Sequence, residues 1–141
     1  MYKCILLPVD LGHEASWERA APAAVSLAQQ YGAKVNVLSV IPDYGMPVVG
    51  GFFPEDFAEK ALEATTTELE NFARTHIPED VRGKVRAVHG TIYKRIIINA
   101  DQMDCDLIVL GSHRPEKADY LLGPNAARVV RHANQSVFVV R

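Results

Sequence analysis

The stretch DLIVLGSHRPEKADYLLGPNAARVVRHANQSVFVVR, residues 106–141, carries the clearest signal for the fold. It opens with one short apolar run, Asp106 to Leu110, and closes with another, Ser136 to Val140. The segment from Gly123 to Ala133 between them contains a short predicted helix. A short continuous apolar run indicates a strand that is buried on both faces, as in a parallel sheet. Two such strands joined through a helix predict a right-handed crossover.

The same alternation extends back to the amino terminus. Three further apolar runs predict strands at Cys4 to Pro8, Lys34 to Ile41 and Lys84 to His89. Helices are predicted from Ser16 to about Tyr31, from Glu55 to about His76 and from Thr91 to Met103. Buried strands alternating with helices predict an α/β fold, a five-stranded, doubly wound, Rossmann-like parallel open sheet with helices on both faces. We expect residues 1–141 to form a single domain.

Three residues bear on the bounds of the first helix. Ser16 can cap its start, and Gly32 is expected to end it as the residue after the last turn. Pro22 lies inside the predicted helix, where a proline should kink it or displace its start.

Composition excludes several function classes. The chain has a formal net charge of −2, which argues against a surface that binds nucleic acid in general. Its longest apolar run near the amino terminus is too short for a signal peptide or a membrane span. We therefore expect a cytoplasmic protein that engages neither nucleic acid nor membrane.

Cysteines and histidines give little sign of a metal site. Cys4 and Cys105 are the only cysteines and form no CxxC motif, so they are interpreted as two reduced, buried, small hydrophobic residues. The five histidines are dispersed and form no HExxH pair, so no zinc site is predicted.

Two loops at the predicted carboxyl edge of the sheet could bind a ligand. Asp10 places a carboxylate after the first strand, and Gly111 follows the fourth strand directly. Gly123 stands at a helix start, where free N–H groups and the helix dipole favour phosphate oxygens. Doubly wound sheets bind ligands at this edge, where the winding direction reverses. Taken alone, the two loops are also compatible with ordinary turns.

Three segments together resemble the universal stress protein family: CILLPVD, VNVLSVIPD and residues 106–141. The run GSHRP followed by YLLG-x-NAA-x-VVRHA is similar to the F/G-type branch. The resemblance implies the strand order 3-2-1-4-5, dimers paired through the last strand, and an adenine-nucleotide pocket between strands 1 and 4. By position it implies Pro8, Val9 and Asp10 for the adenine and ribose, and Val40 for the adenine edge. It implies Leu110, Gly111, His113 and Arg114 for the ribose and first phosphate, and Gly123, Pro124, Asn125 and Ala126 for the outer phosphates.

The chain departs from the ATP motif of that family, G-x2-G-x9-G-[ST], in three ways. Arg114 replaces the second glycine, the spacing from Gly111 to Gly123 is one residue short, and Pro124 replaces the final Ser or Thr. Each lost hydrogen bond to a charged group costs about 1.5–3 kcal/mol of binding. Arg114 can offset part of this by pairing with phosphate. Weak or diphosphate-preferring binding is thus as compatible with the sequence as tight ATP binding.

Three functions remain open. We rank first a binding and signalling module for ATP, ADP or AMP, with or without Mg²⁺, that acts as a homodimer, or as a tetramer, on an unidentified protein partner. Next comes an interaction dimer that has lost nucleotide binding, and last a slow ATPase. No nucleophile–base pair or Walker lysine is visible, so we expect no fast catalysis. The edge-strand sequence SVFVV predicts the dimer contact. Pro42 to Pro54, rich in glycine and proline, is interpreted as a mobile flap beside the second strand that a ligand or the dimer partner orders.

Overall fold

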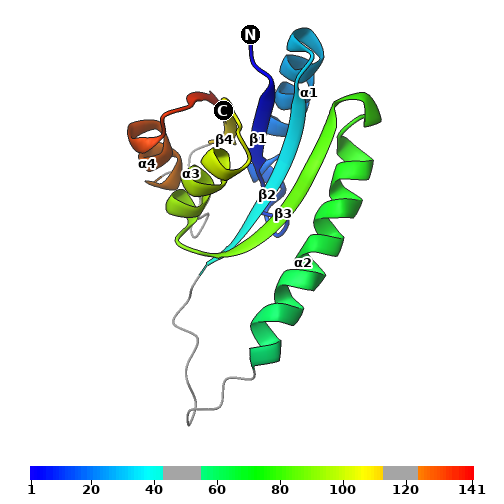
Figure 1. Ribbon diagram of the computed structural model, residues 1–141, viewed down its shortest axis with the longest axis vertical. Coiled ribbons are helices and arrows are strands. Elements are labelled where there is room, and N and C mark those ends of the chain that lie inside the picture. Colours follow the sequence, from blue (N-terminus) through cyan, green and yellow to red (C-terminus); the bar gives the residue numbers. More distant parts are fainter. Residues whose placement is uncertain (43–54, 113–123) are drawn as a thin grey trace.

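The computed structural model describes residues 1–42, 55–112 and 124–141, and its core is a five-stranded sheet in the order β3-β2-β1-β4-β5. All neighbouring strands run parallel (Figure 1). The strands are β1 (Cys4–Pro8), β2 (Lys34–Pro42), β3 (Arg82–Gly90), β4 (Leu107–Gly111) and β5 (Ser136–Val140). The α-helices are α1 (Ala20–Tyr31), α2 (Glu55–His76), α3 (Ile92–Gln102) and α4 (Pro124–His132), and two short 3-10 helices are η1 (Glu14–Ser16) and η2 (Glu79–Val81).

Helices cover both faces of the sheet, as the alternating pattern predicts. Leu7 of β1 packs in one core cluster with residues of α1 and α2, whereas Leu6 packs in a second cluster with residues of α3 and α4. Figure 1 shows α2 lying along β3, with α3 and α4 close together on the other side. Adjacent residues of a strand point to opposite faces, so a strand apolar at every position is covered on both sides. The predicted fold class and strand order are confirmed.

The predicted start of the first helix is wrong. α1 begins at Ala20, preceded by the 3-10 turn η1, and Ser16 does not cap it. Pro22 is the third residue of α1. The N–H groups of the first turn have no acceptor within the helix, so a proline there costs no helical hydrogen bond. The proline therefore displaces the helix start, one of the two effects predicted for it. Gly32 ends the helix with φ 68°, as predicted.

The other elements match the predictions to within one or two residues at each end. The Ile96–Ile98 run, which favours a strand locally, is helical in α3, with Ile96 buried and Ile98 exposed. The packing of one helix face against the sheet overrides the local preference of β-branched residues. The predicted flap falls almost wholly outside the described residues.

β5 forms one edge of the sheet, as SVFVV predicts. It pairs with β4 alone, and Phe138 and Val139 are 47% and 39% exposed. Among the described residues, no helix is both long and apolar enough to cross a membrane.

Candidate functional site

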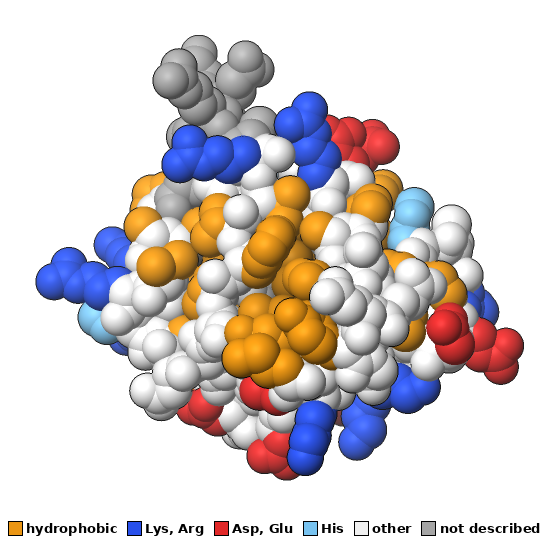
Figure 2. Space-filling view, turned by 90° about the horizontal axis from the view of Figure 1, so that it is seen from above, with side chains coloured by type: hydrophobic (Ala, Val, Ile, Leu, Met, Phe, Trp, Pro, Cys, Tyr) orange, Lys and Arg blue, Asp and Glu red, His pale blue; other side chains and the backbone are white. Residues whose placement is uncertain are grey.

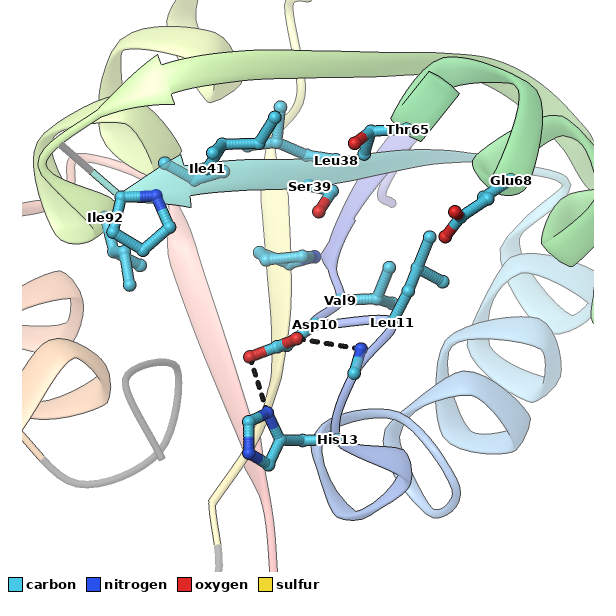
Figure 3. Close-up of a pocket in the computed structure, with 14 residues that line it drawn as sticks. Val9, Asp10, Leu11, His13, Leu38, Ser39, Ile41, Thr65, Glu68 and Ile92 are labelled. Carbon is cyan, nitrogen blue, oxygen red and sulfur yellow. Dashed lines mark hydrogen bonds and ion pairs between the residues drawn. The ribbon is translucent and has the colours of Figure 1, made fainter. Parts of the chain in front are cut away.

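A pocket of about 350 Å³ opens where β1 and β2 end. Its walls come from the loop after β1, the last part of β2, one side of α2 and the first residue of α3 (Figure 3). The lining residues are Pro8, Val9, Asp10, Leu11, Gly12, His13, Leu38, Ser39, Val40, Ile41, Pro42, Thr65, Glu68 and Ile92. The pocket therefore lies at the carboxyl edge of the sheet, where the fold class predicts a ligand site.

Asp10 is the carboxylate at the mouth of this pocket. Its Oδ1 accepts a hydrogen bond from the Gly12 N–H at 3.0 Å, and its Oδ2 lies 2.9 Å from His13 Nδ1. Figure 3 shows both interactions at the loop that follows β1. The Asp10 side chain is 33% exposed, so its oxygens keep lone pairs that a ligand can reach. A carboxylate held in this way can accept hydrogen bonds from hydroxyl groups.

Ser16 holds the backbone of that loop in place. Its hydroxyl accepts the Asp10 N–H at 2.9 Å and reaches the His13 carbonyl oxygen, to which it can donate, at 2.7 Å. The residue is fully buried. A buried hydroxyl with partners on both sides of a turn fixes the conformation of that turn. Ser16 therefore positions Asp10, instead of capping the helix as the sequence predicts.

Gly111 packs against this loop from β4. A Cβ atom at position 111 would collide with the Ser16 carbonyl oxygen and lie 3.0 Å from its carbon. The glycine therefore lets the backbone of η1 approach β4 closely. This is a structural reason for the glycine in addition to the ligand approach predicted from the sequence.

The structure brings only part of the predicted site together. Pro8, Val9, Asp10 and Val40 line the pocket. Leu110 is fully buried in the core beside α3 and α4, and Gly111 borders a separate small pocket that Arg19 and Arg141 also line. The remaining predicted residues are Pro124, Asn125 and Ala126, which open α4, and His113, Arg114 and Gly123, which lie outside the described residues.

Ten of the lining residues were not predicted from the sequence, and four of them are Ser39, Thr65, Glu68 and Ile92. Ser39 is a buried polar residue in an otherwise apolar part of β2, a signal that could have been noticed. Thr65 and Glu68 are three residues apart on α2, which places them on the same side of that helix. Figure 3 shows these two side chains across the pocket from Asp10. Ile92, the fourth, begins α3.

The lining favours a ligand that is partly apolar and partly hydroxylated. Val9, Leu38, Val40 and Ile41 supply an apolar wall, whereas Asp10 supplies acceptor oxygens. Within residues 1–42, 55–112 and 124–141, no group of three His, Cys, Asp or Glu residues is placed to hold a metal ion. The described part of the pocket places an apolar wall beside hydrogen-bond acceptors.

Comparison with known proteins gives matches along the whole chain. The model of the universal stress protein family matches residues 1–141. Universal stress protein G of Shigella flexneri is 33% identical over 147 residues, covering 100% of both chains. The solved structure of UspA from Lactobacillus plantarum is 28% identical with a TM-score of 0.73, covering 99% of this chain and 98% of that one. A universal stress protein solved in complex with cAMP is 20% identical with a TM-score of 0.63, covering 99% of this chain and 97% of that one.

Proposed function

The chain belongs to the universal stress protein family, and we propose that it binds an adenine nucleotide in the Asp10 pocket as a signalling module. The observation that carries this proposal is the placement of the Asp10 carboxylate at the mouth of a pocket at the carboxyl ends of β1 and β2. A protein of the same fold has been solved with cAMP, which makes an adenine nucleotide the first ligand class to test.

In the proposed complex the adenine ring lies against the apolar wall and the ribose hydroxyls donate to Asp10. Val40 is part of that wall and offers its backbone to the edge of the ring. Ring burial supplies the hydrophobic part of the binding free energy, and charge-assisted hydrogen bonds fix the sugar. The apolar wall and Asp10 line the same pocket, and the volume of that pocket is in the usual range for small-molecule sites.

We assign the phosphates to the segment between β4 and α4. Arg114 would pair with phosphate oxygens, and Gly123 with the start of α4 would supply backbone N–H groups. Phosphate binding at a helix start is favoured by the helix dipole. Because Pro124 lacks an N–H, we expect the outermost phosphate to contribute little, so ADP and ATP should bind with similar affinities.

Calorimetric titration of nucleotide-free protein with ATP, ADP, AMP and adenosine tests the proposal. Asp10→Ala should weaken all four by about ten- to a hundredfold, because it removes hydrogen bonds to the sugar that every one of them makes. Glu14→Ala is the control, since Glu14 is an exposed carboxylate close in sequence that does not line the pocket. Equal losses in the two variants would contradict the assignment.

Failure of all four ligands to bind below a dissociation constant of about a millimolar would remove the proposed function. The second candidate, an interaction dimer without nucleotide, would then take its place. It is favoured by one observation, the exposed apolar side chains of the edge strand β5.

We propose in either case that β5 pairs with its counterpart in a second copy. Unpaired strand edges with apolar side chains associate readily, and a twofold axis makes the contact self-complementary. Val139→Lys should shift the protein to monomer in light scattering, because it places a charge in the contact. Ile98→Lys on α3 is the matched control, since Ile98 and Val139 are 40% and 39% exposed. A wild-type monomer at micromolar concentration would contradict the dimer.

A further inference from the structure

The amino ends of the strands hold two thiols in direct contact, at the edge of the sheet opposite the Asp10 pocket. Cys4 begins β1 and Cys105 lies two residues before β4, and their Sγ atoms are 2.7 Å apart. Asn36 of β2 donates a hydrogen bond from Nδ2 to Cys4 Sγ at 3.2 Å, and the same Nδ2 lies 3.7 Å from Cys105 Sγ. Both cysteines are free thiols. Three neighbouring strands thus bring two sulfur atoms and one amide together.

Asn36 is held in place by an irregularity in the sheet. The register between β2 and β3 shifts between Val35 and Val37, and the Lys84 N–H donates to Asn36 Oδ1 at 2.8 Å. Gly83 allows this arrangement, because a Cβ atom there would collide with Asn36 Oδ1. Asn36 is only 6% exposed. Since β3 occupies its oxygen, the amide nitrogen remains directed at the two sulfurs.

The two thiols differ in access to solvent. Cys4 is half-buried and lines a pocket of about 320 Å³, whereas Cys105 is 4% exposed and does not line it. Four cations also line that pocket: Lys3, Lys34, Lys84 and Arg86. Figure 2 views the molecule from this end and shows hydrophobic side chains near the centre with charged side chains around them. The prediction of a buried thiol is confirmed for Cys105, and Cys4 is the more accessible of the two.

The two thiols also differ in acidity. The hydrogen bond between the two thiols lowers the pKa of Cys4 below its ordinary value, against the effects of burial and of Asp106 and Asp104. The same hydrogen bond, together with burial, raises the pKa of Cys105. The thiolate is the nucleophilic form of cysteine, so these two shifts favour Cys4 over Cys105 as an attacking sulfur.

We propose that Cys4 and Cys105 form a reversible redox couple, in which a hydroperoxide in the pocket oxidises Cys4 and Cys105 then closes an intramolecular disulfide. A disulfide needs sulfur atoms about 2.05 Å apart, so the two need approach by only about 0.7 Å from their present 2.7 Å. A partly exposed cysteine beside a second thiol is the arrangement typical of redox-sensing cysteines.

The chemistry balances in two steps. The Cys4 thiolate attacks one peroxide oxygen, the O–O bond breaks, and the sulfur becomes a sulfenic acid while the other oxygen leaves as hydroxide or alkoxide and takes up a proton. Cys105 sulfur then attacks Cys4 sulfur, the S–S bond forms, the S–O bond breaks, and the hydroxyl leaves with the Cys105 proton as water. The two thiols are oxidised by two electrons and the peroxide is reduced. A dithiol reductant reduces the disulfide back to two thiols by thiol–disulfide exchange.

Hydrogen peroxide treatment of the reduced full-length protein tests the proposal directly. The number of free thiols, titrated under denaturing conditions, should fall from two per chain to none. The intact mass should show the loss of two hydrogen atoms with no added oxygen. Dithiothreitol should restore both thiols. Persistence of both thiols, formation of chains cross-linked to one another, or addition of oxygen without loss of both thiols would each overturn the proposal. This test involves no nucleotide, so its failure would leave the proposed function untouched.

Two single variants test the order of the steps. Cys105→Ser should stop at the sulfenic acid of Cys4, which dimedone traps as a stable adduct. Cys4→Ser should retain its remaining thiol under the same treatment, because Cys105 is buried. Circular dichroism and thermal unfolding establish that each variant is folded, and the wild-type mass measurement decides the proposal if either is not. Equal rates of thiol loss in Cys4→Ser and wild type would overturn the assignment of Cys4 as the attacking sulfur.

Discussion

The two ends of the parallel sheet are built on the same plan but present different chemistry. At the carboxyl end, buried Ser16 holds the Asp10 turn, and Gly111 makes room for the Ser16 backbone. At the amino end, buried Asn36 directs its amide at Cys4, and Gly83 makes room for the Asn36 side chain.

The difference lies in what each buried polar residue positions. Ser16 positions a carboxylate, which accepts hydrogen bonds and suits reversible binding of a hydroxylated ligand. Asn36 contacts two sulfur atoms, which can exchange electrons and form a covalent bond. Each edge of one small sheet can carry its own chemistry, because parallel strands bring distant parts of the chain together at both ends.

Gly111→Ala should have the largest effect on stability, and it should act at the carboxyl end of the sheet. Its Cβ would overlap the backbone carbonyl of Ser16, which cannot move without displacing the Asp10 turn. We expect a loss of about 3 kcal/mol in the free energy of unfolding, measured by urea denaturation. Nucleotide binding should weaken as well, while peroxide still removes both thiols. Unchanged stability would show that η1 does not need its close approach to β4.

Gly83→Ala should act at the other end, with a stability loss of about 2 kcal/mol. The nearest atom to the new Cβ is the side-chain oxygen of Asn36, which can move more easily than backbone, although the Val35 carbonyl lies 2.9 Å away. Displacing the amide should slow peroxide oxidation of Cys4 and leave nucleotide affinity at its wild-type value. An equal loss of nucleotide affinity in both glycine variants would mean that the two ends are not independent.

Glu68→Gln should have the smallest effect of the three, a change in nucleotide affinity at the carboxyl end of the sheet. Glu68 lines the Asp10 pocket from α2, and its negative charge opposes bound phosphates. Removing the charge should increase the affinity for ATP and ADP by about fivefold, or about 1 kcal/mol, and leave the affinity for adenosine unchanged. Titrations at low and high salt check this, since the gain should shrink as salt screens the charges.

Glu70→Gln is the matched control for this prediction, because Glu70 is an exposed carboxylate on the same helix that does not line the pocket. If Glu70→Gln raised the affinity for ATP and ADP as much as Glu68→Gln, the net charge of the protein, and not the lining of the pocket, would set that affinity.

Much of the fold and part of the candidate site could be predicted from the sequence. Continuous apolar runs such as Ile5 to Leu7 are buried on both faces, so a parallel sheet covered by helices follows from the pattern alone. Asp10 could be placed at the carboxyl edge because it follows the first of those runs directly. Gly32 could be identified as a helix end because its left-handed conformation favours glycine.

The remaining features depend on contacts between residues far apart in the sequence, which no local pattern records. Ser16 has the sequence context of a helix cap, yet it ends the 3-10 turn η1 and α1 begins only at Ala20, so its hydroxyl bonds within the Asp10 turn. Glu68 reaches the pocket only because α2 packs beside β2 and β3. Cys4 and Cys105 are 101 residues apart in the sequence, and their sulfurs meet because β1 pairs with β4. Local propensity and hydrophobic pattern thus determined the elements and their layers, whereas strand pairing decided which side chains meet, because that pairing joins residues without regard to their separation along the chain.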